Sequence, residues 1–149
     1  NGSVVVGAAY PKGGYDEPFI WDRVHGIRRL DQPGGGPAIF GMPTGVSADG
    51  SIVVGRGSVD PGGASRPFIW DAEHGVRFLD DLLTSLGIDL SDWRLGGAVG
   101  ISADGRTILG VGSHFSTGQE AWIAVIPEPS VALLLGLGLA GLGGPRRRH

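Results

Sequence analysis

The stretch Asp49-Gly50-Ser51-Ile52-Val53-Val54-Gly55 decides the fold. Asp-Gly is a strong hairpin signal because both residues tolerate positive φ angles. The run of Ile and Val that follows is typical of a buried strand. The same pattern recurs as Gly2-Ser3-Val4-Val5-Val6-Gly7 and, more loosely, as Gly105-Arg106-Thr107-Ile108-Leu109-Gly110. This self-similarity predicts a chain built from copies of one supersecondary unit.

Two further segments repeat in step with the first. Pro18-Phe19-Ile20-Trp21-Asp22 recurs as Pro67-Phe68-Ile69-Trp70-Asp71, with a weaker third copy at Ala121-Trp122-Ile123-Ala124. His25-Gly26-Ile27-Arg28-Arg29-Leu30-Asp31 recurs as His74-Gly75-Val76-Arg77-Phe78-Leu79-Asp80. The first two copies lie about 50 residues apart, which is within the range of propeller repeats. The order of the segments is therefore the same in each unit.

Each unit predicts about four short strands, seen most completely at Thr44–Ser47, Ser51–Gly55, Pro67–Asp71 and Val76–Leu79. Four antiparallel strands in about fifty residues match the size of a propeller blade. A sandwich of hairpins is the main alternative, because strand spacing alone does not separate the two. We expect an all-β fold: a partial β-propeller-like repeat of four-stranded antiparallel units.

The repeat region spans residues 1–125, in units of about 1–42, 43–97 and 98–125. Asn1-Gly2 aligns with Asp49-Gly50, so the first unit lacks its first strand, and we expect upstream repeats and an export signal to lie outside this sequence. One insertion interrupts the strands. Asp80–Gly87 has an acidic start, three Leu at helical spacing and a terminating Gly, which predicts a two-turn helix.

Composition excludes several classes of function. The chain has 12 Lys and Arg against 15 Asp and Glu, and three of its arginines are the consecutive Arg146, Arg147 and Arg148 near the C-terminus. The repeat region is therefore acidic and offers no basic face for nucleic acid. The sequence contains no Cys, which excludes disulfides and thiolate metal sites.

The histidines and Asp-Gly pairs suggest turns more strongly than chemistry. His25 and His74 occupy equivalent positions before a Gly, as turn residues do, and His114 has no partner at ligand spacing. Asp49 and Asp104 lack the alternating oxygen ligands of a calcium loop. We predict no metal site, no cofactor and no catalytic residue.

The tryptophans offer one alternative to a purely structural repeat. Trp21 and Trp70 are equivalent in the repeat, which favours core packing. A carbohydrate-binding face that uses Trp21, Trp70 or Trp93 for stacking is the second hypothesis.

The last two dozen residues form three consecutive blocks. Pro127-Glu128-Pro129 precedes an aliphatic run at residues 130–144, and Arg146–Arg148 follow it. As a helix the run would span about 22 Å, less than the roughly 30 Å of a bilayer core, so a transient segment is expected rather than a permanent anchor. The arginines would stay in the cytoplasm and place the repeat region across the membrane. The apolar membrane-segment residues are Val131, Leu133, Leu134, Leu135, Leu137, Leu139 and Leu142.

The repeat region resembles the bacterial extracellular HAF repeats. The resemblance rests on Ser47–Gly55, Pro67–Trp70 and Gly75–Leu79, and it covers the chain to about Val125. The signature His is replaced in all three copies, whereas the strand pattern is kept. This resemblance implies an exported β-propeller-like protein and no particular chemistry.

The tail closely resembles the PEP-CTERM sorting signal. This resemblance implies a Gram-negative exported protein whose tail is recognised and cut by an exosortase, a membrane-embedded cysteine protease. Pro127, Glu128 and Pro129 would be the recognition residues, the aliphatic run the transient inner-membrane segment, and Arg146–Arg148 the retention charges. Such proteins are often linked to exopolysaccharide and biofilm matrix. The sequence therefore predicts a non-enzymatic protein of the cell surface or extracellular matrix.

Overall fold

The computed structural model describes residues 2–31 and 39–127. Within these ranges the chain forms strands and one short helix, in the following order: β1 (Val4–Ala9), β2 (Glu17–Asp22), β3 (Gly26–Arg29), β4 (Phe40–Val46), β5 (Ile52–Ser58), β6 (Arg66–Asp71), β7 (Gly75–Phe78), α1 (Leu79–Ser85), β8 (Trp93–Ile101), β9 (Thr107–His114) and β10 (Gly118–Val125).

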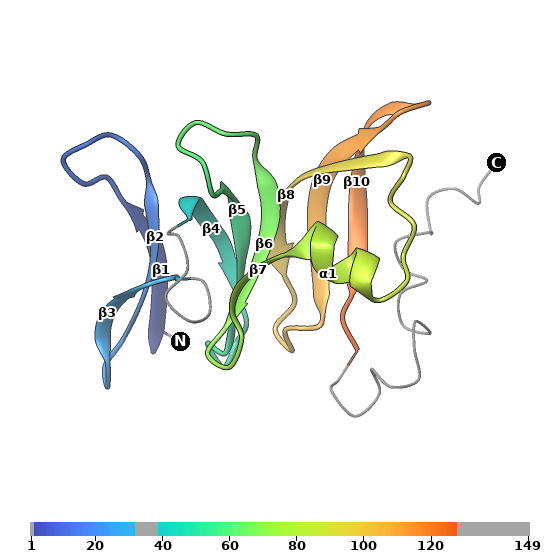
Figure 1. The fold of residues 1–149 in the computed structure, drawn as a ribbon. Helices are drawn as coiled ribbons and strands as arrows, with labels where there is room; N and C mark the ends of the chain where they lie inside the picture. Colours follow the sequence, from blue (N-terminus) through green and yellow to red (C-terminus); the bar gives the residue numbers. More distant parts are fainter. Residues whose placement is uncertain (1, 32–38, 128–149) are drawn as a thin grey trace.

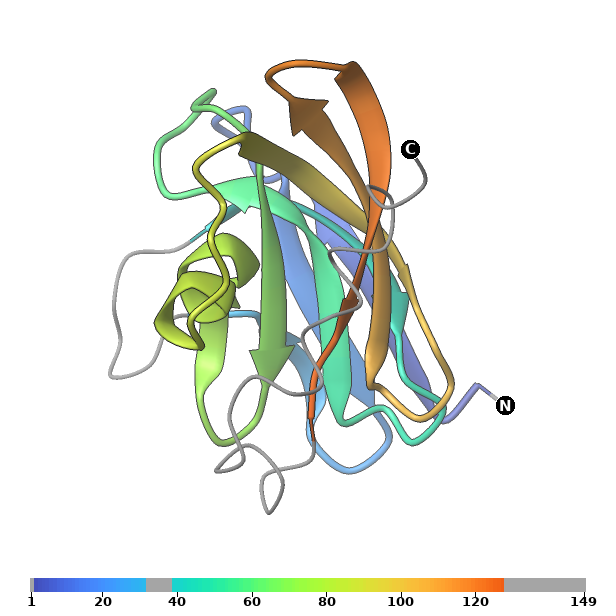
Figure 2. The same ribbon diagram turned by 90° about the vertical axis from the view of Figure 1, so that its right-hand side faces the viewer.

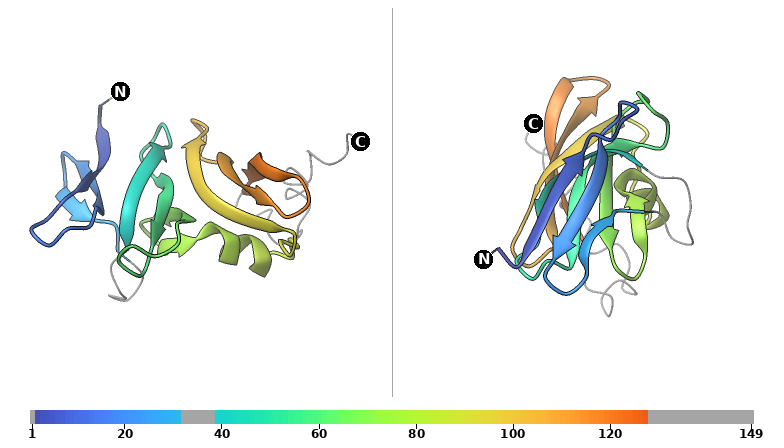
Figure 3. Two further views of the ribbon diagram at one scale, coloured as in Figure 1. Left: turned by 90° about the horizontal axis from the view of Figure 1, so that it is seen from above. Right: turned by 90° about the vertical axis from the view of Figure 1, so that its left-hand side faces the viewer.

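The strands make three antiparallel sheets that stand side by side in chain order (Figure 1). The first sheet is β1-β2-β3, the middle sheet is β4-β5-β6-β7 and the third sheet is β10-β9-β8. Seen from above, the sheets line up in a row with their faces opposed (Figure 3). The prediction of an all-β chain of antiparallel repeats is confirmed. The sheets described here do not close into a propeller ring or a barrel.

The middle sheet is buried on both faces, which explains why its strands read as continuous apolar runs. On β5, Val53 packs toward the first sheet and Val54 toward the third, and both are fully buried. The cluster between the first and middle sheets consists of Ile20, Leu30, Ile39, Val53, Phe68, Trp70 and Val76. The cluster between the middle and third sheets consists of Val54, Ile69, Leu79, Leu83, Leu95, Ala98, Ile108, Trp122 and Ala124.

Each sheet contains an aromatic ring that occupies the space over a glycine of the neighbouring strand. The pairs stand in direct register: Gly7 with Phe19, Gly55 with Phe68, and Gly110 with Trp122. A Cβ atom added to the glycine would come within 2.8, 2.6 and 2.0 Å of the ring, respectively. These contacts are too short for any other residue, so the strand glycines are required by packing.

Strand β4 begins earlier than the predicted Thr44, at Phe40, and β8 begins at Trp93, before the predicted start of the third unit at about residue 98. Pro43 argues against a strand at this position, so the sequence did not predict the full length of β4. The structure accommodates Pro43 because β4 is an edge strand with a bulge between Pro43 and Gly45. Two bulges in β8, at Leu95/Gly97 and Ala98/Gly100, break the alternation of side chains that a sequence prediction relies on.

The prediction of four strands in every unit is correct only for the middle sheet. The first sheet begins with the equivalent of β5, as the alignment of Asn1-Gly2 with Asp49-Gly50 indicates. The third sheet has β8, β9 and β10 and no counterpart of β7 within the described residues, which continue for only two residues after Val125.

The predicted helix is confirmed as α1, which lies beside the middle sheet and contributes Leu79 and Leu83 to the second core cluster. Arg66 on β6 fixes its first turn, because Nε and Nη2 donate to the Asp80 carboxylate at 2.9 and 2.8 Å. The Arg66 guanidinium also lies 4.1 Å from the centre of the Phe78 ring. Burial of one face and this bidentate pair hold a helix that is too short to be stable alone.

Among the residues that the structure describes, no helix is long and apolar enough to cross a membrane. The predicted membrane segment at residues 130–144, the motif residues Glu128 and Pro129, and Arg146–Arg148 lie outside the described residues. Pro127 is described and lies two residues after the end of β10 at Val125.

The close contact between glycine and ring predicts that replacing the glycine destabilises the fold. Gly110→Ala should lower the free energy of unfolding by about 1–3 kcal/mol, because the new methyl group collides with the Trp122 ring. Urea denaturation followed by Trp fluorescence measures the change. Gly100→Ala on neighbouring β8 is the matched control, since a Cβ there meets nothing within 4 Å. Equal loss of stability in both variants would contradict the packing argument.

Candidate functional site

The two equivalent histidines belong to two copies of the same turn. In the hairpin of β2 and β3, Asp22 Oδ1 accepts hydrogen bonds from the backbone N–H groups of Val24 and His25, both at 2.8 Å. The His25 ring Nδ1 lies 3.0 Å from the same carboxylate, and Arg28 donates to Oδ2 at 2.5 Å. The cluster closes the turn, as the position of His25 in the repeat predicted.

The hairpin of β6 and β7 repeats the arrangement. Asp71 accepts from the backbone of Glu73 at 3.0 Å and of His74 at 2.8 Å, and Arg77 donates to it at 2.8 Å. The repetition of every partner shows that these residues form a structural turn. Two identical catalytic centres would each need a substrate site. Arg77 lines a hollow of about 430 Å³, but none of the described hollows is lined by Asp22, His25 and Arg28 or by Asp71 and His74.

The electrostatics of these carboxylates oppose a role in proton transfer. The backbone N–H of His25, and after it the ring of the same residue, lower the pKa of Asp22 to about 2. For Asp71, burial raises the pKa, but the hydrogen bonds from His74 and the charge of Arg77 outweigh it and leave the pKa below its ordinary value. A general acid or base works best when its pKa lies near the operating pH. Both carboxylates are therefore suited to holding a turn.

The Asp-Gly hairpins use their carboxylates in the same way. Asp49 accepts hydrogen bonds from the Ser51 backbone at 3.0 Å, the Ser51 hydroxyl at 2.7 Å and the Ser47 hydroxyl at 2.8 Å. The glycine that follows, Gly50, has a φ of 76°, as the hairpin prediction requires. Asp104 makes equivalent contacts with Ser102 and the backbone of Arg106. Among the described residues, no group of three or more His, Asp or Glu side chains is placed to hold a metal ion.

The three tryptophans proposed for ligand stacking do not come together. Trp70 is 8% exposed and packs in the core between the first and middle sheets, which confirms the favoured interpretation of core packing and excludes Trp70 from the alternative stacking face. Trp21 is half-buried on the outward face of the first sheet, in register with Val5 and Ile27. Trp93 begins β8 at the other end of the row and meets the His114 ring edge-on, with 5.2 Å between ring centres.

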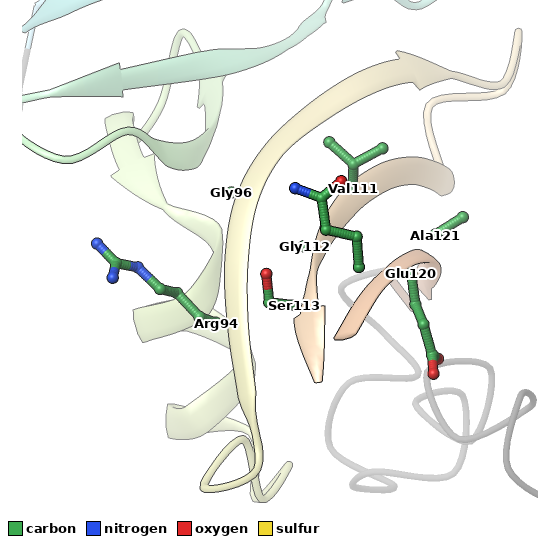
Figure 4. A pocket seen from close by; sticks show the side chains of 8 residues that line it. Arg94, Gly96, Val111, Gly112, Ser113, Glu120 and Ala121 are labelled. Atoms are coloured by element: carbon green, nitrogen blue, oxygen red, sulfur yellow. The ribbon is translucent and has the colours of Figure 1, made fainter. Parts of the chain in front are cut away.

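A hollow with a volume of about 570 Å³ lies on the third sheet (Figure 4). Register explains it. Register places Gly97, Val111 and Ala121 in one row across the sheet and Arg94, Ser113 and Gln119 in the next row. Gly96 on β8 and Ala121 on β10 line the hollow and leave space on either side of Val111, whereas a side chain at Gly97 would point toward Arg56 of β5. The hollow is therefore produced by small residues at the edges of the sheet.

The floor of this hollow is neutral. Figure 4 shows both charged residues, Arg94 on β8 and Glu120 on β10, extending away from Ser113. The remaining polar groups in the lining are the Ser113 hydroxyl and the Gln119 amide, beside the apolar Val111 and Ala121. A lining of this kind suits a neutral ligand that both donates and accepts hydrogen bonds.

Sequence reasoning did not identify the hollow. The signal available in the sequence is the density of small residues in Gly96-Gly97-Ala98 together with Gly112 and Ala121. Those residues become a depression only when the two bulges of β8 set their register with β9.

Comparisons of the chain with protein-family models, with curated proteins and with solved structures found no match.

The lowered pKa values predict how stability depends on pH. Hydrogen bonds from Ser51 and Ser47 lower the pKa of Asp49 from its ordinary value of 3.8 to about 2. Because the folded pKa is the lower one, the stabilisation is complete above about pH 4 and is lost as the pH falls through about 2. The difference in urea midpoint between the natural chain and Asp49→Ala should follow that course.

Glu73→Ala is the matched control, since Glu73 is an exposed carboxylate in a turn and its side chain makes none of the described hydrogen bonds or ion pairs. A midpoint difference for Asp49→Ala that stays constant from pH 7 to pH 2 would contradict the assignment.

Proposed function

We propose that the protein is a non-enzymatic, exported protein of the cell surface or extracellular matrix, sorted by a tail of the PEP-CTERM kind. The observation that carries this proposal is the order of the C-terminal blocks: Pro127-Glu128-Pro129, an aliphatic run at residues 130–144, and Arg146–Arg148. The body adds support, because the strongly perturbed carboxylates described above are all engaged in turns.

The tail acts in a defined sequence in this proposal. The aliphatic run enters the inner membrane transiently, and the three arginines hold its end in the cytoplasm. The repeat region lies on the other side, where the Pro127-Glu128-Pro129 motif is presented to an exosortase. Cleavage near the motif releases the repeat region to the surface or matrix. The short run supports processing over permanent anchoring.

The repeat region is a partial β-propeller-like array in this proposal. Neighbouring blades of a propeller pack face to face, and so do the three sheets here (Figure 3). The two junctions are also alike in one respect, since aliphatic residues of one sheet meet the aromatic strand of the next at each of them. The array would supply a rigid body to which a matrix polymer binds.

If an exosortase cuts the tail, both the mass of the chain and the cell fraction that contains it should change. The chain with an epitope tag near its N-terminus should lose its last residues in Gram-negative cells that contain an exosortase, and should keep them in cells without one. Immunoblotting of membrane and external fractions measures both effects. Replacement of Pro127, Glu128 and Pro129 by alanine should retain the long form in the membrane. The control replaces Pro11, a proline of the first sheet's loop, by alanine. An identical mass and location in both strains would reject the sorting role.

A second candidate function is binding of exopolysaccharide, and the observation that favours it is the neutral hollow on the third sheet. Its volume of about 570 Å³ lies within the range of small-ligand sites. A polysaccharide is rich in hydroxyl groups, which match the Ser113 hydroxyl and the Gln119 amide. Trp21 and Trp93 lie outside this lining, so the proposed site differs from the three-tryptophan face.

Filling the hollow tests this candidate. Ala121→Arg should lower the affinity for a neutral polysaccharide by about tenfold or more, because the new side chain occupies the space over Val111. Ala9→Arg, at an exposed position of β1, is the matched control and should bind as the natural chain does. Binding is measured on a glycan array and by titration. Equal binding by both variants would exclude the hollow as the ligand site.

A further inference from the structure

A second hollow adjoins the one on the third sheet. It has a volume of about 340 Å³, which lies within the range of small-ligand sites. We call it the helix hollow, because α1 forms one of its walls, and we call its neighbour the third-sheet hollow. Figure 2 shows α1 at the side of the sheets and the connection after it rising to the start of β8. The lining of the helix hollow includes Arg66, Asp80, Asp81, Thr84, Trp93 and Arg94.

The charged wall of the helix hollow is fixed by contacts within the protein. Arg66 Nη2 lies 2.8 Å from Asp80 Oδ1 and 2.7 Å from Asp81 Oδ1. Thr84 Oγ1 donates to the backbone oxygen of Asp80 at 2.8 Å. Among the described residues, only Arg66 contacts the Asp81 carboxylate, whose side chain is 73% exposed. A carboxylate has about four acceptor positions, so Asp81 keeps positions free for the hydroxyl groups of a ligand.

Trp93 supplies an aromatic surface beside this polar wall. Its ring packs against the second core cluster and lies 5.2 Å from the centre of the His114 ring, so its position is fixed. Its side chain remains half-buried and lines the helix hollow. An indole ring combines a large apolar surface with one N–H donor. A sugar ring has the matching pattern, because its C–H groups form an apolar face and its hydroxyl groups lie at the edge.

Arg94 lies where the two hollows meet, because it lines both of them. It is exposed, and none of the hydrogen bonds or ion pairs among the described residues uses its guanidinium. Figure 4 shows this side chain extending away from Ser113 of the third-sheet hollow. The helix hollow has two arginines and two aspartates, Arg66 and Arg94 against Asp80 and Asp81, so its formal charges cancel. Such a lining favours a neutral ligand rich in hydroxyl groups.

We propose that one extended chain of a neutral polysaccharide occupies both hollows. One sugar unit lies against Trp93 in the helix hollow, and another lies over Val111 in the third-sheet hollow. The Arg94 guanidinium donates hydrogen bonds to hydroxyl groups between them. This inference rests on the proposed binding of exopolysaccharide, and it adds the course of the ligand across the protein. Two linked contacts hold one long ligand more tightly than either contact alone, because the second contact forms within the complex.

Titration of the whole chain with neutral β-linked glucose oligosaccharides tests the inference. An oligosaccharide long enough to reach both hollows should bind at least about tenfold more tightly than the disaccharide. Thr84→Arg fills the helix hollow from an exposed position on α1 and should remove this advantage of length. Ser85→Arg is the matched control and should bind as the natural chain does, since Ser85 is the exposed neighbour on α1 and lines neither hollow.

Tryptophan fluorescence gives a second measurement that does not depend on Thr84→Arg. The long oligosaccharide should change the emission of the natural chain, and Trp93→Phe, which keeps a ring against the core cluster, should remove most of this change. The inference is overturned if both oligosaccharides bind equally, if Thr84→Arg keeps the advantage of length, or if Trp93→Phe leaves the emission change intact.

The same titrations separate the inference from the function on which it rests. Binding of the long oligosaccharide that Ala121→Arg weakens and Thr84→Arg does not would overturn the inference and leave the third-sheet hollow as the ligand site. A natural chain that binds neither oligosaccharide would overturn the polysaccharide function together with the inference.

Discussion

The contact between an aromatic ring and a bare strand glycine is the constraint on which the rest of this structure depends. The ring of Phe19, Phe68 or Trp122 lies in the space that a side chain on the opposing strand would fill. A large apolar surface is thereby placed close to the backbone of its own sheet, and the next sheet can approach without a ridge between them. The ring belongs to Phe in two sheets and to Trp in the third, yet the pairing with glycine is retained in each. Substitution of the glycine is excluded sterically, so the repeat keeps glycine in the middle of a strand despite its low strand preference.

The middle sheet shows how this constraint organises the core. Phe68 and Trp70 point to one side and Ile69 to the other, so a three-residue segment contributes to both clusters. Helix α1 extends the second cluster with Leu79 and Leu83, and it belongs to the longer connection between the middle and third sheets.

Charged groups, in contrast, lie at the ends of the strands. Asp22, Asp49, Asp71 and Asp104 each hold a turn through backbone hydrogen bonds, and this work requires an ionised carboxylate.

Much of this arrangement could be predicted from the sequence, because it depends on short segments whose conformation is determined by neighbouring residues. The Asp49-Gly50 hairpin, the apolar run of β5 and the helix after Leu79 follow from turn chemistry and periodicity. The repeat itself indicated that His25 and His74 are turn residues. The starts of β4 and β8 could not be predicted, because Pro43 and the bulges around Gly97 interrupt alternation, and their tolerance depends on both strands lying at sheet edges. The different burial of Trp21 and Trp70 could not be predicted either, because these equivalent residues differ only in whether another sheet covers them. The hollow beside Val111 depends on register between three strands, which no single segment contains.

The equivalence of the two junctions has a consequence for how such a chain changes over evolutionary time. Because every sheet presents one aliphatic face and one aromatic face, a duplicated or deleted sheet meets its new neighbours through surfaces that already fit. Array length can therefore vary by recombination between repeats without any compensating substitution in the core. Sequence divergence is then free to accumulate in the loops and at the outer rows of the sheets, where each repeat can acquire a surface chemistry of its own.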